Sequence, residues 1–189
     1  IIDRPFPKVA PEDYKPYLAG EDKVPPMAHF GSEYLVHASS SMHDETGYPN
    51  NKPENADKVI RRLYDKIYDH LDEIIITKEF NLQDADVVFV ACGVSARSSR
   101  EAVQILGQEG IRAGLLQLNT VWPFADEKVK EVAKNAEMIF VPEMNLGQMI
   151  NEVKRVVGDK PVYGINKVDS TIITPYDIIE KVKGVRGDV

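Results

Sequence analysis

From Asp84 to its C-terminal end, the sequence alternates four times between an apolar run of strand length and an amphipathic run of helix length. The first apolar run, residues 85–92, is continuous from Val87 to Cys92, which is typical of a strand buried on both faces of a sheet. Strands joined by helices run parallel, because a parallel pair needs a long crossover connection. The pattern therefore predicts a three-layer α/β/α fold with a mostly parallel sheet.

Cap and stop residues set the expected bounds of these elements. Asn145 and Thr174 have side chains that cap helix N-termini, and Gly184 is of the type that follows a helix. We expect the first two to begin the last two helices and Gly184 to follow the last. The expected strands are residues 85–92, 111–119, 137–143 and 161–166, and the expected helices lie in residues 95–110, 126–136, 145–158 and 174–184.

The first 53 residues differ from the rest, because they hold eight of the twelve prolines. Proline fixes φ and lacks a backbone donor, so an extended arm is expected, with one short strand candidate at Glu33–Ser39. Apolar residues at helical spacing then predict an unbroken helix from Pro53 to about Glu73. We expect an arm (1–53), a connecting helix (54–80) and an α/β domain (81–189), packed together as one unit.

Composition excludes several classes of function. The chain has 189 residues and a net charge of −7, which argues against binding a nucleic-acid backbone. Its single cysteine, Cys92, excludes an internal disulfide and a cluster held by four thiolates of this chain. No apolar run is long enough to span a membrane, and a cytoplasmic location is expected. The chain begins without Met, so we expect a piece of a longer protein.

Ligands of open α/β sheets bind at the carboxyl ends of strands, and the first such end is followed by Gly93. With Ser95, Arg97 and Ser98, this glycine opens a helix whose free N–H groups suit an anion. The turn lacks the three glycines of a dinucleotide-binding motif. A plain strand-to-helix turn is the favoured interpretation, and a site for a phosphate-bearing ligand such as coenzyme A is the alternative.

The second carboxyl end carries Trp122 and Phe124 on either side of Pro123. Aromatic anchors of this kind are enriched at protein interfaces. The pair either packs under a neighbouring domain or subunit, or caps the core of this domain. Both interpretations stay open.

The third carboxyl end holds Glu143, Asn145, Gly147 and Gln148. A buried glutamate could act as a general base, because burial raises its pKa. No His, Ser or Lys lies in the same turn to share proton transfer, so no catalytic residue is predicted. We expect an ordered turn that faces another domain or subunit.

A histidine-containing segment of the arm has side chains of metal-ligand type. His37, His43, Asp44 and Glu45 are close in sequence, but their spacing matches no zinc pattern. No metal site is predicted.

Five segments occur in an order that is recognisable. Together they closely resemble the α subunit of 2-oxoacid:ferredoxin oxidoreductases, and most closely the 2-oxoglutarate type. The resemblance covers about residues 25–184. The segments are HDETGYP (43–49), VIRRLYDKI (59–67), VACGVSARSSREAV (90–103), LNTVWPFAD (118–126) and EMNLGQM (143–149).

This resemblance implies a C-terminal part of the subunit, similar to the transketolase C-terminal domain. Such enzymes use thiamine diphosphate and Mg²⁺ to decarboxylate a 2-oxoacid, pass electrons through an iron–sulfur cluster to ferredoxin, and transfer the acyl group to coenzyme A. It further implies that these cofactors are held by an N-terminal thiamine-binding domain and a β subunit. We expect this chain to act as scaffold and subunit contact, to bind no cofactor alone, and to be inactive in isolation.

Overall fold

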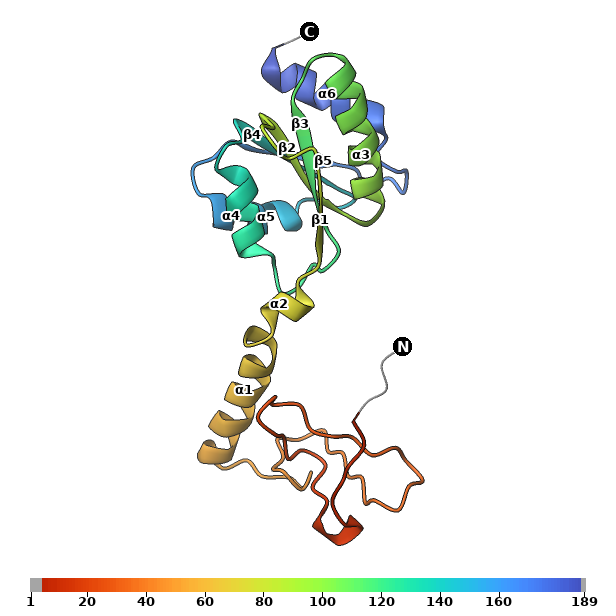
Figure 1. Ribbon diagram of the computed structural model, residues 1–189, viewed down its shortest axis with the longest axis vertical. Helices are drawn as coiled ribbons and strands as arrows, with labels where there is room; N and C mark the ends of the chain where they lie inside the picture. The colour runs from red at the N-terminus through yellow and green to blue at the C-terminus, as the bar shows by residue number, and fades with distance from the viewer. Residues whose placement is uncertain (1–4, 188–189) are drawn as a thin grey trace. The chain divides into compact units, whose positions relative to one another are not determined.

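The computed structural model describes residues 5–187, and the chain forms two compact units, Ile1–Leu71 and Asp72–Val189. Figure 1 labels the helices and strands of both. Each unit has a different construction. The boundaries expected at residues 53 and 80 stay a prediction.

A five-stranded sheet forms the centre of the second unit, with the strand order β1-β3-β2-β4-β5. The four last strands along the chain pair in parallel, whereas β1 pairs antiparallel with β3 at one edge. This arrangement confirms the mostly parallel sheet, and β1 is an addition that the sequence did not predict. The strands are β1 (Thr77–Phe80), β2 (Val87–Cys92), β3 (Ala113–Leu118), β4 (Met138–Glu143) and β5 (Val162–Asn166).

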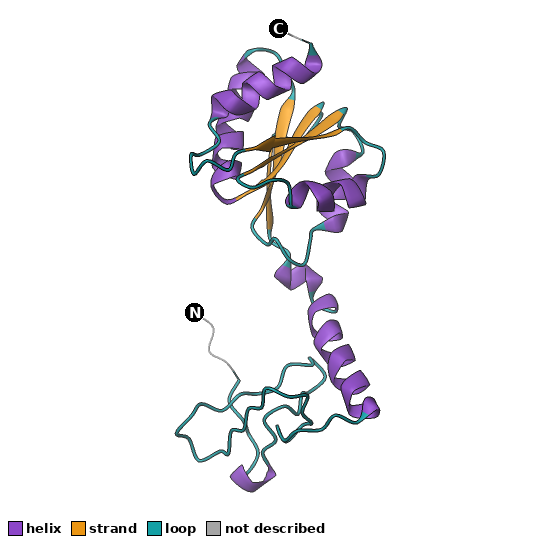
Figure 2. Cartoon of the chain, turned by 180° about the vertical axis from the view of Figure 1, so that it is seen from behind, coloured by secondary structure: helices purple, strands orange, loops and turns teal. Residues whose placement is uncertain are grey.

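Two helices cover each face of the sheet (Figure 2). On one face lie α3 (Gly93–Gln108) and α6 (Pro175–Arg186), and on the other lie α4 (Asp126–Ala133) and α5 (Met149–Val157). The predicted three layers are therefore confirmed.

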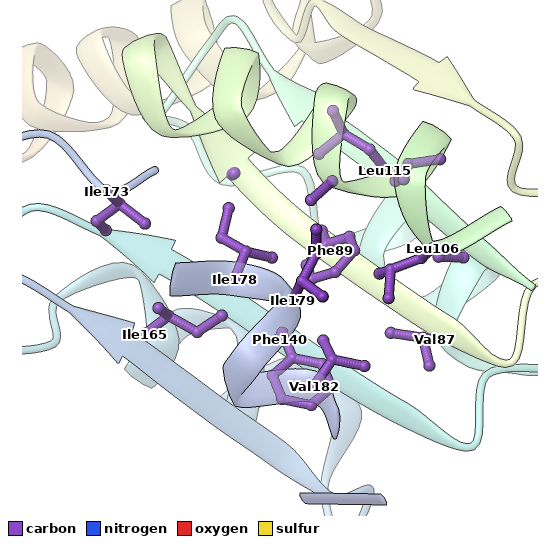
Figure 3. Packing of buried hydrophobic residues seen from close by; sticks show 14 of the residues in the cluster. Val87, Phe89, Leu106, Leu115, Phe140, Ile165, Ile173, Ile178, Ile179 and Val182 are labelled. Carbon is purple, nitrogen blue, oxygen red and sulfur yellow. The ribbon is translucent and has the colours of Figure 1, made fainter. Parts of the chain in front are cut away.

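Alternation along β2 explains why its sequence is apolar throughout. Val87 and Phe89 belong to the core under α3 and α6, where Phe89 packs beside Phe140 (Figure 3). Val88 and Val90 belong to the core under α4 and α5. Because successive side chains point to opposite faces, a central strand covered on both sides must be apolar at every position.

The last helix begins as expected and ends later. Thr174 and Asp177 form a reciprocal capping box, in which each side chain accepts a hydrogen bond from the backbone N–H of the other. The expectation that Gly184 follows the helix is wrong, because α6 continues through it to Arg186. Gly187 is the actual C-cap, with φ +77°, a conformation that glycine adopts without a steric penalty.

The first unit contains η1 (Pro11–Asp13) and the helix α1 (Pro53–Tyr68). The strand expected at Glu33–Ser39 is absent, because no neighbouring segment pairs with it. The expected unbroken helix is also wrong: α1 ends at Tyr68, and a separate short helix, α2 (Leu71–Ile74), follows. The break lies at Asp69 and His70, where the backbone forms a tight turn with the carbonyl of Ile67.

Within residues 5–187, none of the helices has both the length and the apolar character needed to cross a bilayer.

Candidate functional site

The carboxyl ends of β2 and β4 form the topological switch point of the sheet. The helix after β2 passes to one face and the helix after β4 passes to the other. Phe89 of β2 pairs with Phe140 of β4, and each strand continues for three more residues. The last residues of the two strands, Cys92 and Glu143, are therefore in register. Open α/β sheets bind their ligands outside such a point.

Glu143 is buried at this point, with 3% of its surface exposed. Its Oε2 accepts hydrogen bonds from the backbone N–H groups of Gln148 (3.0 Å) and Met149 (2.8 Å), and its Oε1 accepts one from Ile150 (3.1 Å). The carboxylate thus caps α5 from the end of the preceding strand and lies at the positive end of the helix dipole. Three backbone N–H groups thus hold the carboxylate, and it fixes the turn at the start of α5.

Asn145 orders the rest of the same turn. Its Oδ1 accepts hydrogen bonds from the N–H groups of Gly147 (2.7 Å) and Gln148 (3.1 Å), and its carbonyl accepts one from the side chain of Asn166 (2.9 Å). Gly147 has φ +104°, which disfavours any other residue there. The expectation that Asn145 begins the helix is wrong, because the turn delays α5 until Met149.

The turn after β2 does not gather its candidate residues in one place. Ser95 and Ser98 are only 5% and 8% exposed and lie on the buried side of α3, whereas Arg97 is exposed. Gly93, with φ +55°, begins the helix directly, and Cys92 provides no side-chain cap. The N-terminus of α3 is therefore open, but neither serine is exposed beside Arg97.

The charge at the switch point disfavours the binding of an anion. Burial raises the pKa of the Cys92 thiol, and the nearby Glu143 carboxylate raises it further. The thiol is consequently neutral near pH 7, and the fixed charge beside it is negative.

The two aromatic residues of the second turn have different positions. The Trp122 side chain is 67% exposed, whereas Phe124 is partly buried against the core under α4 and α5. The peptide bond between Trp122 and Pro123 is cis. Thr120 anchors the loop, since its hydroxyl donates to the carbonyl of Ile74 at 2.6 Å.

Exposed apolar side chains of the second unit lie at the end of the sheet where its parallel strands have their carboxyl ends, which we call this edge. Among its described residues, nine large hydrophobic side chains are exposed, and each follows a parallel strand or precedes the antiparallel β1, whose start lies at this edge. Leu146, in the turn after β4, is 88% exposed. We call this set the apolar edge: Ile76, Val94, Val121, Trp122, Met144, Leu146, Val168, Ile172 and Tyr176.

Sequence reasoning identified only Trp122 of this set. The signal for the others is an apolar residue placed just after a strand, within an otherwise polar turn. Leu146, between Asn145 and Gly147, is the plainest case.

Residues 85–178 match the family described as pyruvate:ferredoxin oxidoreductase core domain II. The chain is 38% identical, over 96% of its length, to 2-oxoglutarate synthase subunit KorA of Methanothermobacter thermautotrophicus, and covers 49% of that protein. It is 27% identical, over 98% of its length, to 2-oxoacid:ferredoxin oxidoreductase 2, subunit alpha, of Aeropyrum pernix, and covers 28% of that protein. The chain spans about half the length of the KorA relatives that it matches.

A solved structure is similar over nearly the whole chain. It is the 2-oxoglutarate:ferredoxin oxidoreductase from Magnetococcus marinus with 2-oxoglutarate, coenzyme A and succinyl-CoA bound. The TM-score is 0.83 at 26% identity, and the match covers 96% of this chain and 32% of that one.

Proposed function

Because this chain belongs to the family of 2-oxoacid:ferredoxin oxidoreductase α subunits, we propose that it is the scaffold and subunit-contact part of such an enzyme. The full enzyme converts a 2-oxoacid to acyl-CoA and CO₂ and reduces ferredoxin. 2-Oxoglutarate is the proposed substrate, since relatives that are 37–39% identical to this chain bear the name 2-oxoglutarate synthase. With its single cysteine, the chain suits a reducing compartment, and we place the complex in the cytoplasm.

The apolar edge is the observation that carries this proposal. Several exposed apolar side chains at one end of a sheet are typical of a surface that another protein covers. The group includes Trp122, Met144 and Tyr176, which are residue types enriched at interfaces. We infer that a thiamine-binding domain or the β subunit covers this edge.

The expected cofactors do not fit the residues of this chain. A four-thiolate cluster needs more than Cys92 alone. The carboxylate of Glu143 is buried and holds three backbone N–H groups, and the side-chain oxygen of Asn145 holds two, so binding the Mg²⁺ of a diphosphate here would compete with the bonds that order the turn. We therefore assign thiamine diphosphate, Mg²⁺ and the cluster to companion chains or domains, and we expect this chain to be inactive alone.

Co-expression of the 189-residue chain with the thiamine-binding domain and the β subunit tests the proposal. Leu146→Asp combined with Trp122→Ala should abolish co-purification and, with it, 2-oxoacid-dependent reduction of ferredoxin. Glu137→Ala is the matched control, because this residue is exposed just before β4, at the opposite end of the strand. Full assembly of the double variant, or turnover by the chain alone, would contradict the proposal.

A second candidate is a site for a phosphate-bearing ligand such as coenzyme A at residues 93–99. It is favoured by the open N-terminus of α3 at the switch point, where a Cβ added to Gly93 would meet no atom within 4 Å. It is disfavoured by the adjacent Glu143 carboxylate. Calorimetry of the chain with coenzyme A decides: micromolar affinity, about −8 kcal/mol, that is lost in Arg97→Glu would support the site.

A further inference from the structure

A cavity of about 310 Å³ lies within the first unit, between residues 17–23, residues 43–45 and α1. This volume is at the lower end of the range for small-molecule sites. Leu18, Ala19 and Val59 contribute apolar parts of the wall. The cavity is distant in sequence from every residue of the apolar edge, and its role is separate from the function proposed above.

Three cationic side chains line the cavity, and two of them are neutralised. Lys58 forms an ion pair with Glu45, and this pair lowers the pKa of the glutamate. Lys23 forms ion pairs with Asp65 and Asp69.

Arg62 is the third cation and differs from the two lysines. It is half-buried, and its Nη1 donates a hydrogen bond to the carbonyl of Lys23 at 3.0 Å. No carboxylate of residues 5–187 forms an ion pair with it. One bond holds the guanidinium in place, and its other N–H groups have no carboxylate to bind.

The cavity wall is organised without a ligand. The rings of Tyr17 and His43 lie 3.9 Å apart between centroids. The N–H of Tyr17 donates to the carbonyl of Glu45 at 3.0 Å. Asn55 donates to the carbonyls of His43 (3.0 Å) and Asn50 (2.9 Å). Fixed walls reduce the ordering that binding would require.

We propose that this cavity binds a small organic monocarboxylate, with the carboxylate on Arg62 and the apolar part against Leu18, Ala19 and Val59. A planar guanidinium matches a carboxylate through two parallel hydrogen bonds. Arg62 is the one cation of the lining that forms no ion pair within residues 5–187, and the carboxylate of Asp44 is held by Thr46 and Asn50. Inorganic phosphate carries more negative charge than a monocarboxylate and has no apolar part to place against this wall.

Titration of the 189-residue chain with isovalerate, followed by calorimetry or ligand-observed NMR, tests the site. We expect saturable binding below about 20 mM, and a weakening of about tenfold or more in Arg62→Gln, because a hydrogen bond to a charged group is lost. Arg61→Gln is the matched control. This neighbour is exposed, pairs with Asp57 and does not line the cavity, so its loss should leave the affinity unchanged.

A second variant tests the same site in case Arg62→Gln does not fold. Ala19→Leu narrows the cavity without changing a charged residue, and it should also abolish binding while circular dichroism stays unchanged. Equal affinity for phosphate and isovalerate would overturn the proposal, as would binding that survives in either Arg62→Gln or Ala19→Leu. Absence of any isovalerate binding at about 20 mM would overturn it as well.

Discussion

The second unit buries Phe89, Phe140 and Leu116 completely, in two apolar cores on either side of its sheet. In the first unit, the described residues that are buried are small or are prolines: Pro7, Pro16, Ala28 and Gly47. That unit is held instead by ring contacts and polar contacts, such as the edge-to-face pair of Tyr14 and Tyr34 at 5.0 Å. The apolar area removed from water is the main source of stability, so the two units should differ in their resistance to unfolding.

The two units of the chain are therefore stabilised by different kinds of contact. The second unit has two apolar cores that support its sheet and the turns at the strand ends. The first unit has charged, aromatic and apolar walls around a cavity, and two of its turns contain a glycine at positive φ, Gly31 and Gly47. Four experiments test this contrast, in order of decreasing expected effect.

Removing a core ring should have the largest effect. Phe89→Ala deletes a fully buried side chain and leaves a cavity, and it should destabilise the second unit by about 4 kcal/mol. Leu63→Ala on α1, where the side chain is 44% exposed, should cost less than about 1 kcal/mol. Urea unfolding followed by near-ultraviolet circular dichroism measures both, and equal losses would break the comparison.

Removing the buried carboxylate should come next. Glu143→Ala leaves the N–H groups of Met149 and Ile150 without acceptors, while that of Gln148 keeps the side chain of Asn145, and it should cost about 3 kcal/mol. Glu143→Gln keeps one acceptor oxygen and should cost about half as much. The same urea experiment measures the loss, and a neutral Glu143→Ala would show that water replaces the carboxylate there.

Adding one methyl group to the first unit should cost about 2 kcal/mol. Gly47 has φ +87°, and a Cβ at this position would lie 2.5 Å from the carbonyl oxygen of His37, so Gly47→Ala requires the backbone to shift. Gly184→Ala in α6 is the control. Its Cβ would meet nothing within 4 Å, and it should stabilise the protein by about 0.5–1 kcal/mol. Thermal unfolding of both variants measures the contrast.

A pH effect should be the smallest. Hydrogen bonds from Thr174, with a further one from Lys167, lower the pKa of Asp177 to about 2 from 3.8. The folded pKa is the lower one, so this stability is fully present above about pH 4 and is lost as the pH falls through about 2. Because the side chain is 36% exposed, the contribution should be below about 1 kcal/mol. Asp177→Asn should flatten the stability profile in this window, and an unchanged profile would refute the assignment.

Features with a local signal were predictable from the sequence. The continuous run at Val87–Cys92 predicted the central strand, and Thr174 predicted the start of α6, both of which are confirmed. The resemblance to 2-oxoacid:ferredoxin oxidoreductase α subunits is likewise confirmed. Such features depend on residues adjacent in the chain.

Features that depend on distant partners were not predictable. β1, with the sequence TKEF, is short and half charged, and it becomes a strand because β3 offers an unpaired edge. Glu33–Ser39 has strand-like residues, but it has no such partner. At the candidate site, Ser95 and Ser98 belong to the alternative interpretation, a site for a phosphate-bearing ligand. Their position on the buried side of α3 follows from helix packing, which the local sequence does not reveal.

The turn after β4 has a mechanical consequence. Leu146 projects from a loop that is held on both sides, by the carboxylate of Glu143 and by the amide of Asn145. Because this loop is rigid, it should lose little conformational entropy when a partner binds Leu146. Most of the contact energy should then contribute to affinity. The same rigidity should restrict binding to one orientation of the partner. Because Glu143 bonds the first N–H groups of α5, a displacement of Leu146 should also displace the N-terminus of that helix.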